Sequence, residues 1–255
     1  MKTGVLCDTG RVRSSNQDRV FASCEPVGPL PDLMIVADGM GGHNAGEKAS
    51  ELTVETMLSE IREQVQCPDD VGLWLNTLAQ DANRAVFEAS IENPAWAGMG
   101  TTLVAASVID GWIYGINIGD SRMYVVRADA DGTWQLEQIS EDHSYVGDLV
   151  RAGILTKEEA RHHEKKNLIT RAVGQEPEVQ ADIIIERTEG VQLILLCSDG
   201  LTDMLDDAEI LRVLKLPGFN VQEMAENLTK KANDCGGYDN ISVVMADLRG
   251  DEVQC

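Results

Sequence analysis

Residues 33–43 read LMIVADGMGGH, in which five apolar residues are followed by Asp38, Gly39 and a glycine-rich segment. A short apolar run of this kind predicts an interior strand. Asp38-Gly39 at its end places a carboxylate at the rim of a sheet, where glycine lets the backbone approach a ligand closely. Residues 193–200, LILLCSDG, repeat the pattern with Asp199 and Gly200. Two such sites far apart in the sequence suggest a shared metal centre and hydrolytic chemistry.

Length and charge narrow the choice of protein class. The chain has 255 residues, enough for one large domain, and carries a formal charge of −22. This acidic excess, without any run rich in lysine and arginine, argues against nucleic acid and anionic membrane surfaces as partners. No apolar stretch has the length of a membrane span, and residues 1–8 lack a secretory apolar core. We therefore expect a cytoplasmic protein with no membrane insertion.

The cysteines also indicate a cytoplasmic protein. None of the six lies in a C-x-x-C pair, which argues against a zinc knuckle. In the absence of an export signal, we expect reduced thiols rather than disulfides.

Apolar residues at helical spacing predict two pairs of helices. The first pair covers 45–65, after a capping-box-like start at Asn44 and Glu47, and 71–89, after Asp70. The second pair begins near Asp206 and Asn220, each followed three residues later by glutamate. Between the pairs, residues 145–168 read as a small helical insertion lying over the sheet.

Strand-like segments fill the remaining chain. Four of them form an expected meander, at 103–109, 112–118, 123–128 and 134–139. Asp-Gly pairs at 110–111 and 131–132 are hairpin signals, and Asp120 is expected where the second and third strands turn. Three further strands are expected, at 182–186, 192–197 and 241–246. Strands in meanders with helices in pairs predict an α+β fold rather than a doubly wound parallel sheet.

Polar motifs recur along the chain in a fixed order. They are Arg13-x-x-Asn16-Gln17-Asp18, Asp38-Gly39-Met40-Gly41-Gly42-His43, Gly100-Thr101-Thr102, Gly119-Asp120-Ser121-Arg122, Ser198-Asp199-Gly200-Leu201-Thr202-Asp203 and Gly237-Tyr238-Asp239-Asn240. The series resembles the type 2C, metal-dependent protein Ser/Thr phosphatases (the PPM family) in their compact bacterial form. The resemblance runs from about Lys2 to about Leu248. One Asp-Gly motif is weak, but six motifs in the right order are a strong signal.

The resemblance implies a fold and a domain organisation. The fold would be two packed antiparallel β-sheets flanked by helix pairs, an α-β-β-α four-layer sandwich with the metal centre at one end. Residues 1–250 would form a single phosphatase domain, with 145–168 as a flap beside the site. Residues 251–255 would be a short C-terminal tail.

The resemblance also implies a metal centre with named ligands. Asp38 would bridge two Mn²⁺ or Mg²⁺ ions, and Gly39 would offer its carbonyl oxygen to one of them. Asp199 and Asp239 would hold the other ion. Asp38, Asp199 and Asp239 are therefore the expected catalytic carboxylates.

Other residues match positions around that centre. Asp120 and Asp203 match the positions that bind a third, weaker metal ion in bacterial members. Arg13 matches the arginine that binds the substrate phosphate, and Gln17 and Asp18 would contact metal-bound water. Many relatives have glutamate in place of Gln17, a change that we expect to tune the site.

Elementary electrostatics agrees with such a centre. Two carboxylates about 5 Å apart repel each other by roughly 3 kcal/mol at an effective dielectric constant near 20. Without cations, a converged cluster would raise its own pKa values or disperse. All-oxygen ligands favour hard ions such as Mg²⁺ or Mn²⁺. A water bridging two such ions can attack phosphorus in line, so no covalent phosphoenzyme is needed.

The acid that protonates the leaving group is unassigned. Eukaryotic members of the family carry a histidine directly after the Asp-Gly pair. Here that position is Met40, as in many bacterial members, and His43 is close to it in the sequence.

Two rival functions remain open. Cys7-x-x-Gly10-x-x-Arg13 has the spacing of a cysteine-based phosphatase loop, in which a thiolate attacks the phosphate. Such enzymes usually take an Asp-Pro general acid from later in the chain, and this sequence has no Asp-Pro. The second rival is a non-catalytic phosphoprotein-binding module, which predicts lost metal ligands, whereas every ligand position is intact. The favoured reading is a monomeric phosphatase with phosphoprotein substrates that opposes a bacterial Ser/Thr kinase.

Overall fold

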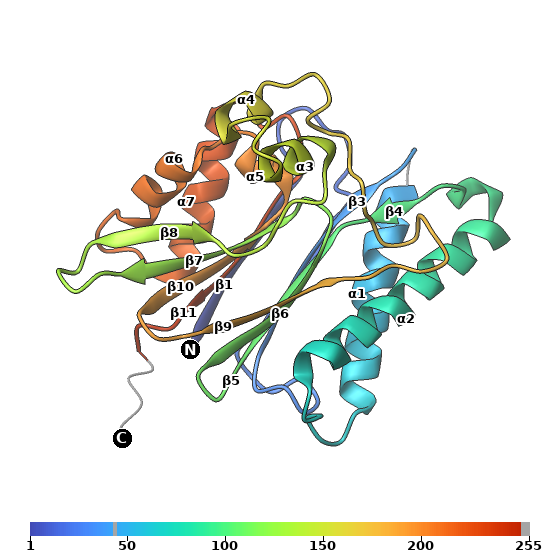
Figure 1. The fold of residues 1–255 in the computed structure, drawn as a ribbon, viewed down its shortest axis with the longest axis horizontal. Coiled ribbons are helices and arrows are strands. Elements are labelled where there is room, and N and C mark those ends of the chain that lie inside the picture. The colour runs from blue at the N-terminus through green and yellow to red at the C-terminus, as the bar shows by residue number, and fades with distance from the viewer. Residues whose placement is uncertain (43–44, 251–255) are drawn as a thin grey trace.

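The computed structural model describes residues 1–42 and 45–250, and the strands in this part of the chain form two antiparallel sheets (Figure 1). The first sheet has the order β1 (Lys2–Asp8), β11 (Ile241–Asp247), β10 (Val191–Cys197), β7 (Arg122–Ala128) and β8 (Trp134–Gln138). The second has the order β2 (Asp18–Ser23), β3 (Leu33–Met40), β5 (Leu103–Ile109), β6 (Trp112–Ile118) and β9 (Asp182–Arg187). A short strand, β4 (Gly100–Thr101), pairs with the end of β3.

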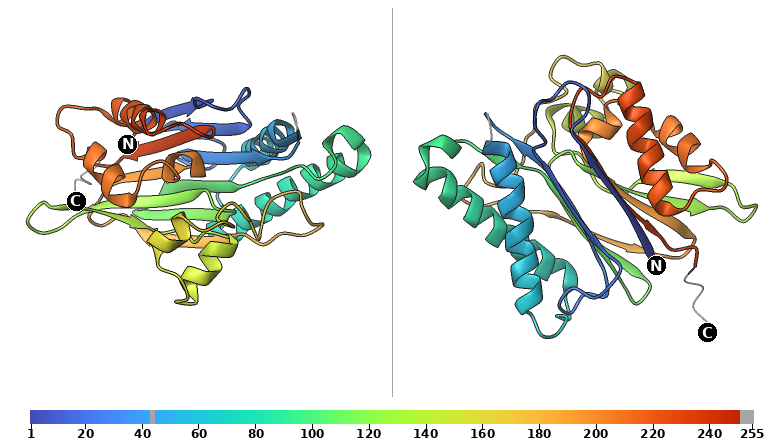
Figure 2. Two further views of the ribbon diagram at one scale, coloured as in Figure 1. Left: turned by 90° about the horizontal axis from the view of Figure 1, so that it is seen from above. Right: turned by 180° about the vertical axis from the view of Figure 1, so that it is seen from behind.

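Helices cover the outer face of each sheet, so the fold has the predicted four layers (Figures 1 and 2). The second sheet is covered by α1 (Ala45–Glu63) and α2 (Val71–Glu92), and the first by α6 (Asp207–Leu214) and α7 (Val221–Asp234). The shorter helices are η1 (Pro94–Trp96), α3 (Tyr145–Arg151), α4 (Lys157–Arg161) and α5 (Asp199–Thr202). Two of these, α3 and α4, form the predicted helical insertion.

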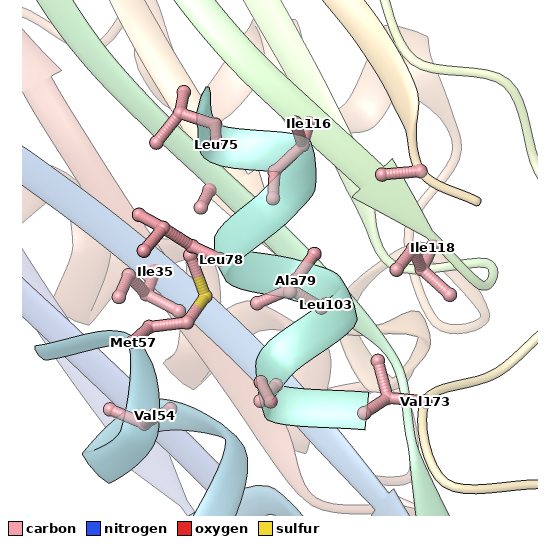
Figure 3. Packing of buried hydrophobic residues seen from close by; sticks show 14 of the residues in the cluster. Ile35, Val54, Met57, Leu75, Leu78, Ala79, Leu103, Ile116, Ile118 and Val173 are labelled. Atoms are coloured by element: carbon pink, nitrogen blue, oxygen red, sulfur yellow. The ribbon is translucent and has the colours of Figure 1, made fainter. Parts of the chain in front are cut away.

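In β3, polar residues do not alternate with the apolar ones. Its residues point alternately to two buried faces, so both faces require apolar side chains. Ile35 faces the helices, where Figure 3 shows it near Met57 of α1 and Leu78 of α2. Met34 faces the other way and packs in the core between the two sheets.

Three of the four predicted helix starts can be compared with the structure, and all three are confirmed. The Asp70 side chain accepts a hydrogen bond from the Leu73 amide at the start of α2. Reciprocal capping boxes begin α6, between Asp206 and Glu209, and α7, between Asn220 and Glu223. The fourth predicted capping residue, Asn44, lies outside the described residues, as does His43.

The predicted four-strand meander is wrong. β5 pairs with β6 and β7 pairs with β8, but β6 and β7 belong to different sheets. Residues 119–121 carry the chain from one sheet to the other, so Asp120 lies in a crossover rather than in a hairpin turn. Apolar periodicity could not reveal this, because it does not specify which strand is a neighbour. The hairpin at Asp110-Gly111 is as predicted, with positive φ at both residues (48° and 78°).

Two further expectations concern the whole described chain. Over residues 1–42 and 45–250, no helix is both long and apolar enough to cross a membrane. The cysteines of this part of the chain are all unpaired; they are Cys7, Cys24, Cys67, Cys197 and Cys235.

Candidate active site

The predicted acidic residues lie at one end of the sandwich because antiparallel pairing brings alternate strand ends together. Asp38 is near the end of β3 and lies directly opposite Asp18, the first residue of β2. Asp199 follows the end of β10, and Asp239 precedes the start of β11, the neighbour of β10. Residues up to 221 positions apart in the sequence are thereby gathered at one rim.

Asp38 has a rigidly held backbone. Its N–H donates to Thr102 Oγ1 at 2.9 Å, and its carbonyl oxygen accepts from the Thr102 N–H at 2.9 Å. The same carbonyl accepts from Thr101 Oγ1 at 2.8 Å. With both backbone polar groups bonded, the direction of the Asp38 side chain is fixed by the Gly100-Thr101-Thr102 segment.

Gly39 is required by close backbone packing. A β carbon at this position would lie 2.1 Å from the Gly46 carbonyl oxygen in the first turn of α1 and 2.5 Å from the Gln17 carbonyl oxygen. The Gly39 N–H also donates to the Gln17 carbonyl oxygen at 3.2 Å. The Gln17 side chain lies at the start of α1, because its Oε1 atom would be 2.9 Å from a β carbon on Gly46.

Asp199 and Asp239 are held in a second tightly packed segment. Asp199 is the first residue of α5, and a β carbon on the following Gly200 would lie 1.9 Å from the Asn240 carbonyl oxygen. The Asp239 carboxylate accepts from the Asn240 N–H at 2.8 Å and from Arg13 Nη2 at 2.7 Å. The residue expected to bind phosphate is thus in direct contact with one of the expected metal ligands.

Burial and mutual repulsion perturb these carboxylates. Burial is the largest cause that raises the pKa of Asp38 well above its usual range, and neighbouring negative charges raise it further. Those neighbours are Asp18, Asp199, Asp120 and Asp239. The pKa of Asp199 is likewise raised, first by burial and then by the charge of Asp120. This end of the sandwich therefore disfavours its own negative charge unless a cation compensates it.

Asp18 is buried beneath the other carboxylates. Its Oδ2 atom accepts from Ser198 Oγ at 2.9 Å, and Ser198 Oγ in turn accepts from the Ser242 N–H at 3.0 Å. Within the described residues, Asp18 Oδ1 has no hydrogen-bond partner. Burial raises the pKa of Asp18 to about 6. A buried carboxylate oxygen without a donor is suited to a hydrogen bond from a water molecule or a hydrated cation.

Asp120 and Asp203 differ in their surroundings. Asp120 is buried in the crossover between the sheets, and burial raises its pKa to about 7. Asp203 is more exposed, and its Oδ2 atom lies 2.6 Å from Lys166 Nζ. The predicted ligands of a weaker metal site are thus one buried carboxylate and one carboxylate already paired with a lysine of the 145–168 segment.

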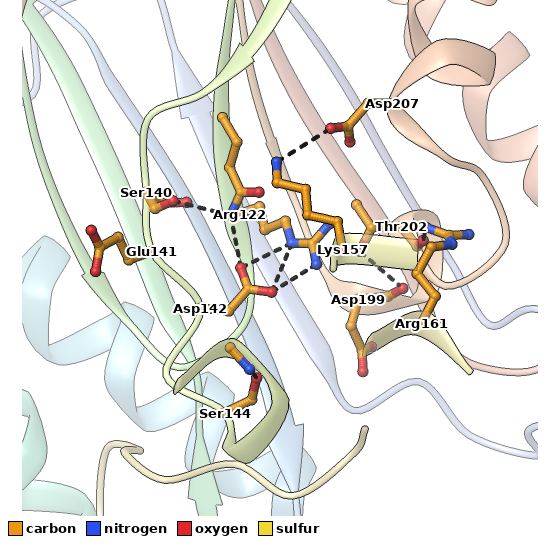
Figure 4. Close-up of polar contacts among 12 residues, drawn as sticks. Arg122, Ser140, Glu141, Asp142, Ser144, Lys157, Arg161, Asp199, Thr202 and Asp207 are labelled. Carbon is orange, nitrogen blue, oxygen red and sulfur yellow. Dashed lines mark hydrogen bonds and ion pairs between the residues drawn. The ribbon is translucent and has the colours of Figure 1, made fainter. Parts of the chain in front are cut away.

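Residues of the 145–168 segment line a cavity of about 510 Å³ together with Asp199 and Asp203. Figure 4 shows polar contacts among residues that line it. On the core side, Arg122 binds Asp142 with two nitrogens, and Nη2 to Oδ2 is 2.7 Å. On the segment side, Arg161 Nη1 donates to the Thr202 carbonyl oxygen at 2.7 Å. The Arg161 contact holds α4 against the residues that follow Asp199.

Two positioning contacts were not predicted from the sequence. The Asn240 side chain accepts from the Gln17 N–H and donates to the Thr9 and Ser15 carbonyl oxygens, all within 3.0 Å. It therefore fixes both ends of the loop that carries Arg13. The Gly237-Tyr238-Asp239-Asn240 motif contained the signal, since a buried asparagine beside a loop commonly bonds backbone groups.

His143 supports the crossover in a similar way. Its Nδ1 atom accepts from the Gly119 N–H at 3.0 Å, and its Nε2 atom lies 3.0 Å from Asp182 Oδ2. Asp182 Oδ1 also accepts from Arg171 Nη1 at 2.5 Å. Since Nδ1 accepts a backbone hydrogen bond, Nε2 carries the proton in neutral His143.

The oxygen-rich set of residues fits hydrated divalent cations. Among the described residues, no three His, Cys, Asp or Glu side chains gather closely enough to hold one metal ion by themselves. Mg²⁺ characteristically keeps several waters and binds through one or two carboxylates, so dispersed aspartates with a backbone carbonyl suit it. The raised pKa values and the unbonded Asp18 Oδ1 indicate where positive charge and water are accommodated.

Cys7 does not have the surroundings of a nucleophilic thiolate. It lies within β1 opposite Ser242, and its sulfur accepts from Asn16 Nδ2 at 3.0 Å and Ser242 Oγ at 3.2 Å. Burial raises its pKa above the usual value, whereas a catalytic cysteine needs a lowered one. Arg13, the arginine of the same Cys7-x-x-Gly10-x-x-Arg13 pattern, forms an ion pair with Asp239 instead.

Comparisons with known proteins identify the family of this chain. A family model for protein phosphatase 2C matches residues 10–235. The serine/threonine phosphatase stp of Listeria innocua is 36% identical over 244 residues, which cover 94% of this chain and 93% of the relative. Protein phosphatase PhpP of Streptococcus pneumoniae is 34% identical over 255 residues, with full coverage of both chains.

A solved structure shares the fold over nearly its whole length. The crystal structure of the serine/threonine phosphatase Stp1 from Staphylococcus aureus has a TM-score of 0.89 at 34% identity. The match covers 98% of this chain and 96% of the Stp1 chain. The two chains therefore share one overall architecture. This chain is a member of the protein phosphatase 2C family, the metal-dependent protein serine/threonine phosphatases.

Proposed function

We propose that this chain hydrolyses phosphoserine and phosphothreonine in proteins with two Mn²⁺ or Mg²⁺ ions held by the aspartates at one end of its sandwich. Asp38 would contact both ions, and the Gly39 carbonyl oxygen would contact one. Asp199 and Asp239 would hold the other. The observation that carries the proposal is the group of carboxylates with raised pKa values at one end of the sandwich, the half-buried Asp38 and Asp199 with the buried Asp18.

Each residue would contribute by position and charge. When bound, the ions would lower the pKa of a water molecule and offset the charge on the phosphate. Thr101 and Thr102 would keep the Asp38 carboxylate aimed at the site through their bonds to its backbone. Asp18 and Gln17 would orient water. Arg13 would exchange its bond to Asp239 for two bonds to phosphate oxygens, a geometry that guanidinium provides and ammonium does not.

A third, weaker ion would bind at Asp120 and Asp203. Because Lys166 is paired with Asp203, occupancy of this position would require the lysine to move.

We propose that residues 145–168 act as a flap and that residues 1–250 form one catalytic domain followed by the 251–255 tail.

The family implies phosphoproteins as substrates, and we propose that a Ser/Thr kinase is their source. The proposed acting form is a monomer. The proposed place of action is the cytoplasm, where thiols such as those of the described cysteines stay reduced.

Hydrolysis of a phosphothreonine peptide tests the proposal. Wild-type protein is assayed with Mn²⁺ and with EDTA, and Asp199→Asn and Cys7→Ser are assayed with Mn²⁺. Asp234→Asn, which changes an exposed aspartate five positions from Asp239, is the matched control. We expect activity to require Mn²⁺, to fall about 100-fold or more in Asp199→Asn, and to survive in Cys7→Ser and Asp234→Asn.

Other outcomes would support the rivals. Activity that resists EDTA but is lost in Cys7→Ser would move the chemistry to a thiolate. If wild-type protein binds the peptide but does not hydrolyse it under any condition, the chain is a phosphoprotein-binding module.

A further inference from the structure

Ser198 is the N-cap residue of α5, yet its side chain serves another contact. A serine at this position usually accepts a hydrogen bond from a backbone N–H in the first helical turn. Within the described chain, the Ser198 side chain makes no such bond. Its Oγ atom donates to Asp18 Oδ2 at 2.9 Å and accepts from the Ser242 N–H at 3.0 Å. The hydroxyl is therefore committed to a contact between the two sheets rather than to its own helix.

This contact closes the apolar core between the sheets. Cys7 and Ser242 lie directly opposite each other in β1 and β11, and Ser198 directly follows β10. The residues two positions further into these strands pack in the core between the sheets; they are Val5, Val244 and Leu196. Because side chains alternate between the two faces of a strand, Cys7 and Ser242 face the same interior. Asp18, which is 1% exposed, meets this polar layer from the second sheet.

Four other residues connect the Asp18 backbone to its own carboxylate. The Asp18 N–H donates to Asn16 Oδ1 at 3.0 Å, and Asn16 Nδ2 donates to Cys7 Sγ at 3.0 Å. Ser242 Oγ donates to the same sulfur at 3.2 Å, and the Ser242 N–H leads on to Ser198. This ring holds Asp18 at two points, its backbone and its Oδ2 atom. A serine oxygen in place of the Cys7 sulfur would accept the same bonds, in keeping with the activity expected of Cys7→Ser.

The ring leaves one oxygen of Asp18 available at the site. Asp18 lies directly opposite Asp38 in the pairing of β2 with β3, so the two side chains lie on the same face of the sheet. Oδ2 is bonded to Ser198, whereas Oδ1 has no partner in the described part of the chain. Ser198 directly precedes Asp199. One hydroxyl therefore links the carboxylate beside Asp38 in the second sheet to the segment that carries Asp199 in the first.

We propose that Ser198 is a positioning residue of the metal centre. Its hydroxyl holds Asp18 Oδ2, so that Oδ1 remains free to accept a hydrogen bond from metal-bound water, and it fixes Asp18 relative to Asp199. The inference rests on the proposed function, because only a chain that binds these ions needs the carboxylate held in this way. Without the hydroxyl, Asp18 Oδ2 loses its donor and the Ser242 N–H loses its acceptor. Metal affinity then falls although no metal ligand has changed.

Mn²⁺ binding in the absence of substrate tests this role. The titration follows the electron paramagnetic resonance signal of free Mn²⁺, and circular dichroism in EDTA first shows that each variant is folded. The variants are Ser198→Ala, Asp18→Asn, their combination and Ser107→Ala. Ser107 is the matched control, because it is a fully buried serine of β5 whose Oγ atom has no partner among the described residues. kcat and KM for a phosphothreonine peptide are measured at saturating Mn²⁺.

We expect the apparent dissociation constant of Mn²⁺ to rise about tenfold in Ser198→Ala and to stay unchanged in Ser107→Ala. Asp18→Asn should raise it at least as much, and the double variant should bind no more weakly than Asp18→Asn alone, because the hydroxyl acts through Asp18. At saturating Mn²⁺, Ser198→Ala should lower kcat about tenfold and leave KM within about twofold, since Arg13 is untouched.

Three results would overturn the proposal. The first is wild-type Mn²⁺ affinity in a folded Ser198→Ala variant. The second is a double variant in which the two losses multiply, since Ser198 would then act independently of Asp18. The third is a rise in KM without a change in kcat, which would place the effect in peptide binding. If Ser198→Ala does not fold, Ser198→Cys, which keeps a weaker donor in the same place, is titrated instead; its Mn²⁺ affinity should fall, and wild-type affinity would contradict the role.

The wild-type protein separates the failure of this inference from failure of the proposed function. If it binds Mn²⁺ and hydrolyses the peptide while Ser198→Ala behaves in the same way, only the positioning role is wrong. If wild-type protein neither binds Mn²⁺ nor hydrolyses the peptide, the proposed function is wrong and the positioning role fails with it.

Discussion

The side-chain oxygens of Thr102 and Ser121 lie 2.7 Å apart in a buried hydrogen bond that joins the two sheets at the catalytic end. Thr102 directly precedes β5 of the second sheet, and Ser121 directly precedes β7 of the first. Thr102 Oγ1 also accepts from the Asp38 N–H, and Ser121 follows Asp120 in the crossover. This contact therefore sets the position of Asp38 relative to Asp120.

Removal of this link should weaken stability and metal binding together. Thr102→Val leaves the Asp38 N–H without its acceptor, so we expect a loss of about 1–3 kcal/mol in the free energy of unfolding. Ser121→Ala should cost less, and the two changes should be coupled by about 1 kcal/mol. Urea unfolding of the single and double variants measures the coupling, and Mn²⁺ titration measures metal activation. Strictly additive effects would show that the hydroxyl pair does not act as a unit.

The two nitrogens of His143 should be separable by substitution. Asparagine can offer an acceptor near the position of Nδ1, so His143→Asn should keep the Gly119 hydrogen bond. Glutamine reaches the position of Nε2 instead, so His143→Gln leaves the Gly119 N–H unbonded at a cost of about 1–3 kcal/mol. We expect the Mn²⁺ concentration for half-maximal activity to rise more in His143→Gln than in His143→Asn. Equal effects on metal activation would mean that His143 only contributes to packing.

Asn240 should control phosphate binding through the Arg13 loop. Asn240→Asp replaces a donor by an oxygen that faces the Thr9 and Ser15 carbonyl oxygens, so the loop should move. We expect the inhibition constant of inorganic phosphate to rise about tenfold, as for loss of one charge-assisted contact. Asn227→Asp, at a half-buried position of α7 where Nδ2 donates to the Glu223 carbonyl oxygen, is the control with an unchanged inhibition constant. An unaffected constant in Asn240→Asp would contradict this role.

We expect the stability that the carboxylates of the site contribute to depend on pH in opposite directions without and with bound metal ions. Burial raises the pKa of Asp18 to about 6 and of Asp120 to about 7, whereas an unfolded aspartate has a pKa of about 4. Between about pH 4 and about pH 7 the folded metal-free protein therefore binds more protons than the unfolded chain. The stability that the Asp18 and Asp120 carboxyls contribute is present at low pH and is lost as the pH rises through this range.

Thermal unfolding with EDTA and with Mn²⁺ measures this effect. We expect the gain in Tm on adding Mn²⁺ to grow between pH 5 and about pH 8, because the cations stabilise the ionised carboxylates. The variant Asp18→Asn should have a smaller pH dependence in EDTA. A gain in Tm that is independent of pH would show that these carboxylates are already ionised without metal.

Local sequence patterns were sufficient for much of the fold. The apolar runs before Asp38 and Asp199 predicted two buried strands, and the helix starts at Asp70, Asp206 and Asn220 are those of the structure. These features depend on interactions between residues close in the chain, such as a side chain that caps the next helical turn. The ordered motifs also identified the aspartates that the structure gathers at one rim.

The pairing of strands could not be predicted in the same way. Residues 112–118 and 122–128 look like consecutive strands of one sheet, yet the chain crosses between sheets at Asp120. The choice depends on whether Met123 and Val125 pack between the sheets with residues more than 60 positions away, such as Ile194. No local pattern contains that information.

The sequence by itself determined which residues are expected to carry the chemistry: the order of the motifs pointed to the aspartates at the Asp-Gly ends of two apolar runs and to Arg13. Only the tertiary structure decided how those residues are supported, through Asn240 across the Arg13 loop, His143 behind the crossover and Thr102 against Ser121. The physical reason is that residue type and short spacing encode chemistry and local structure, whereas these contacts form only after strands distant in the sequence have paired.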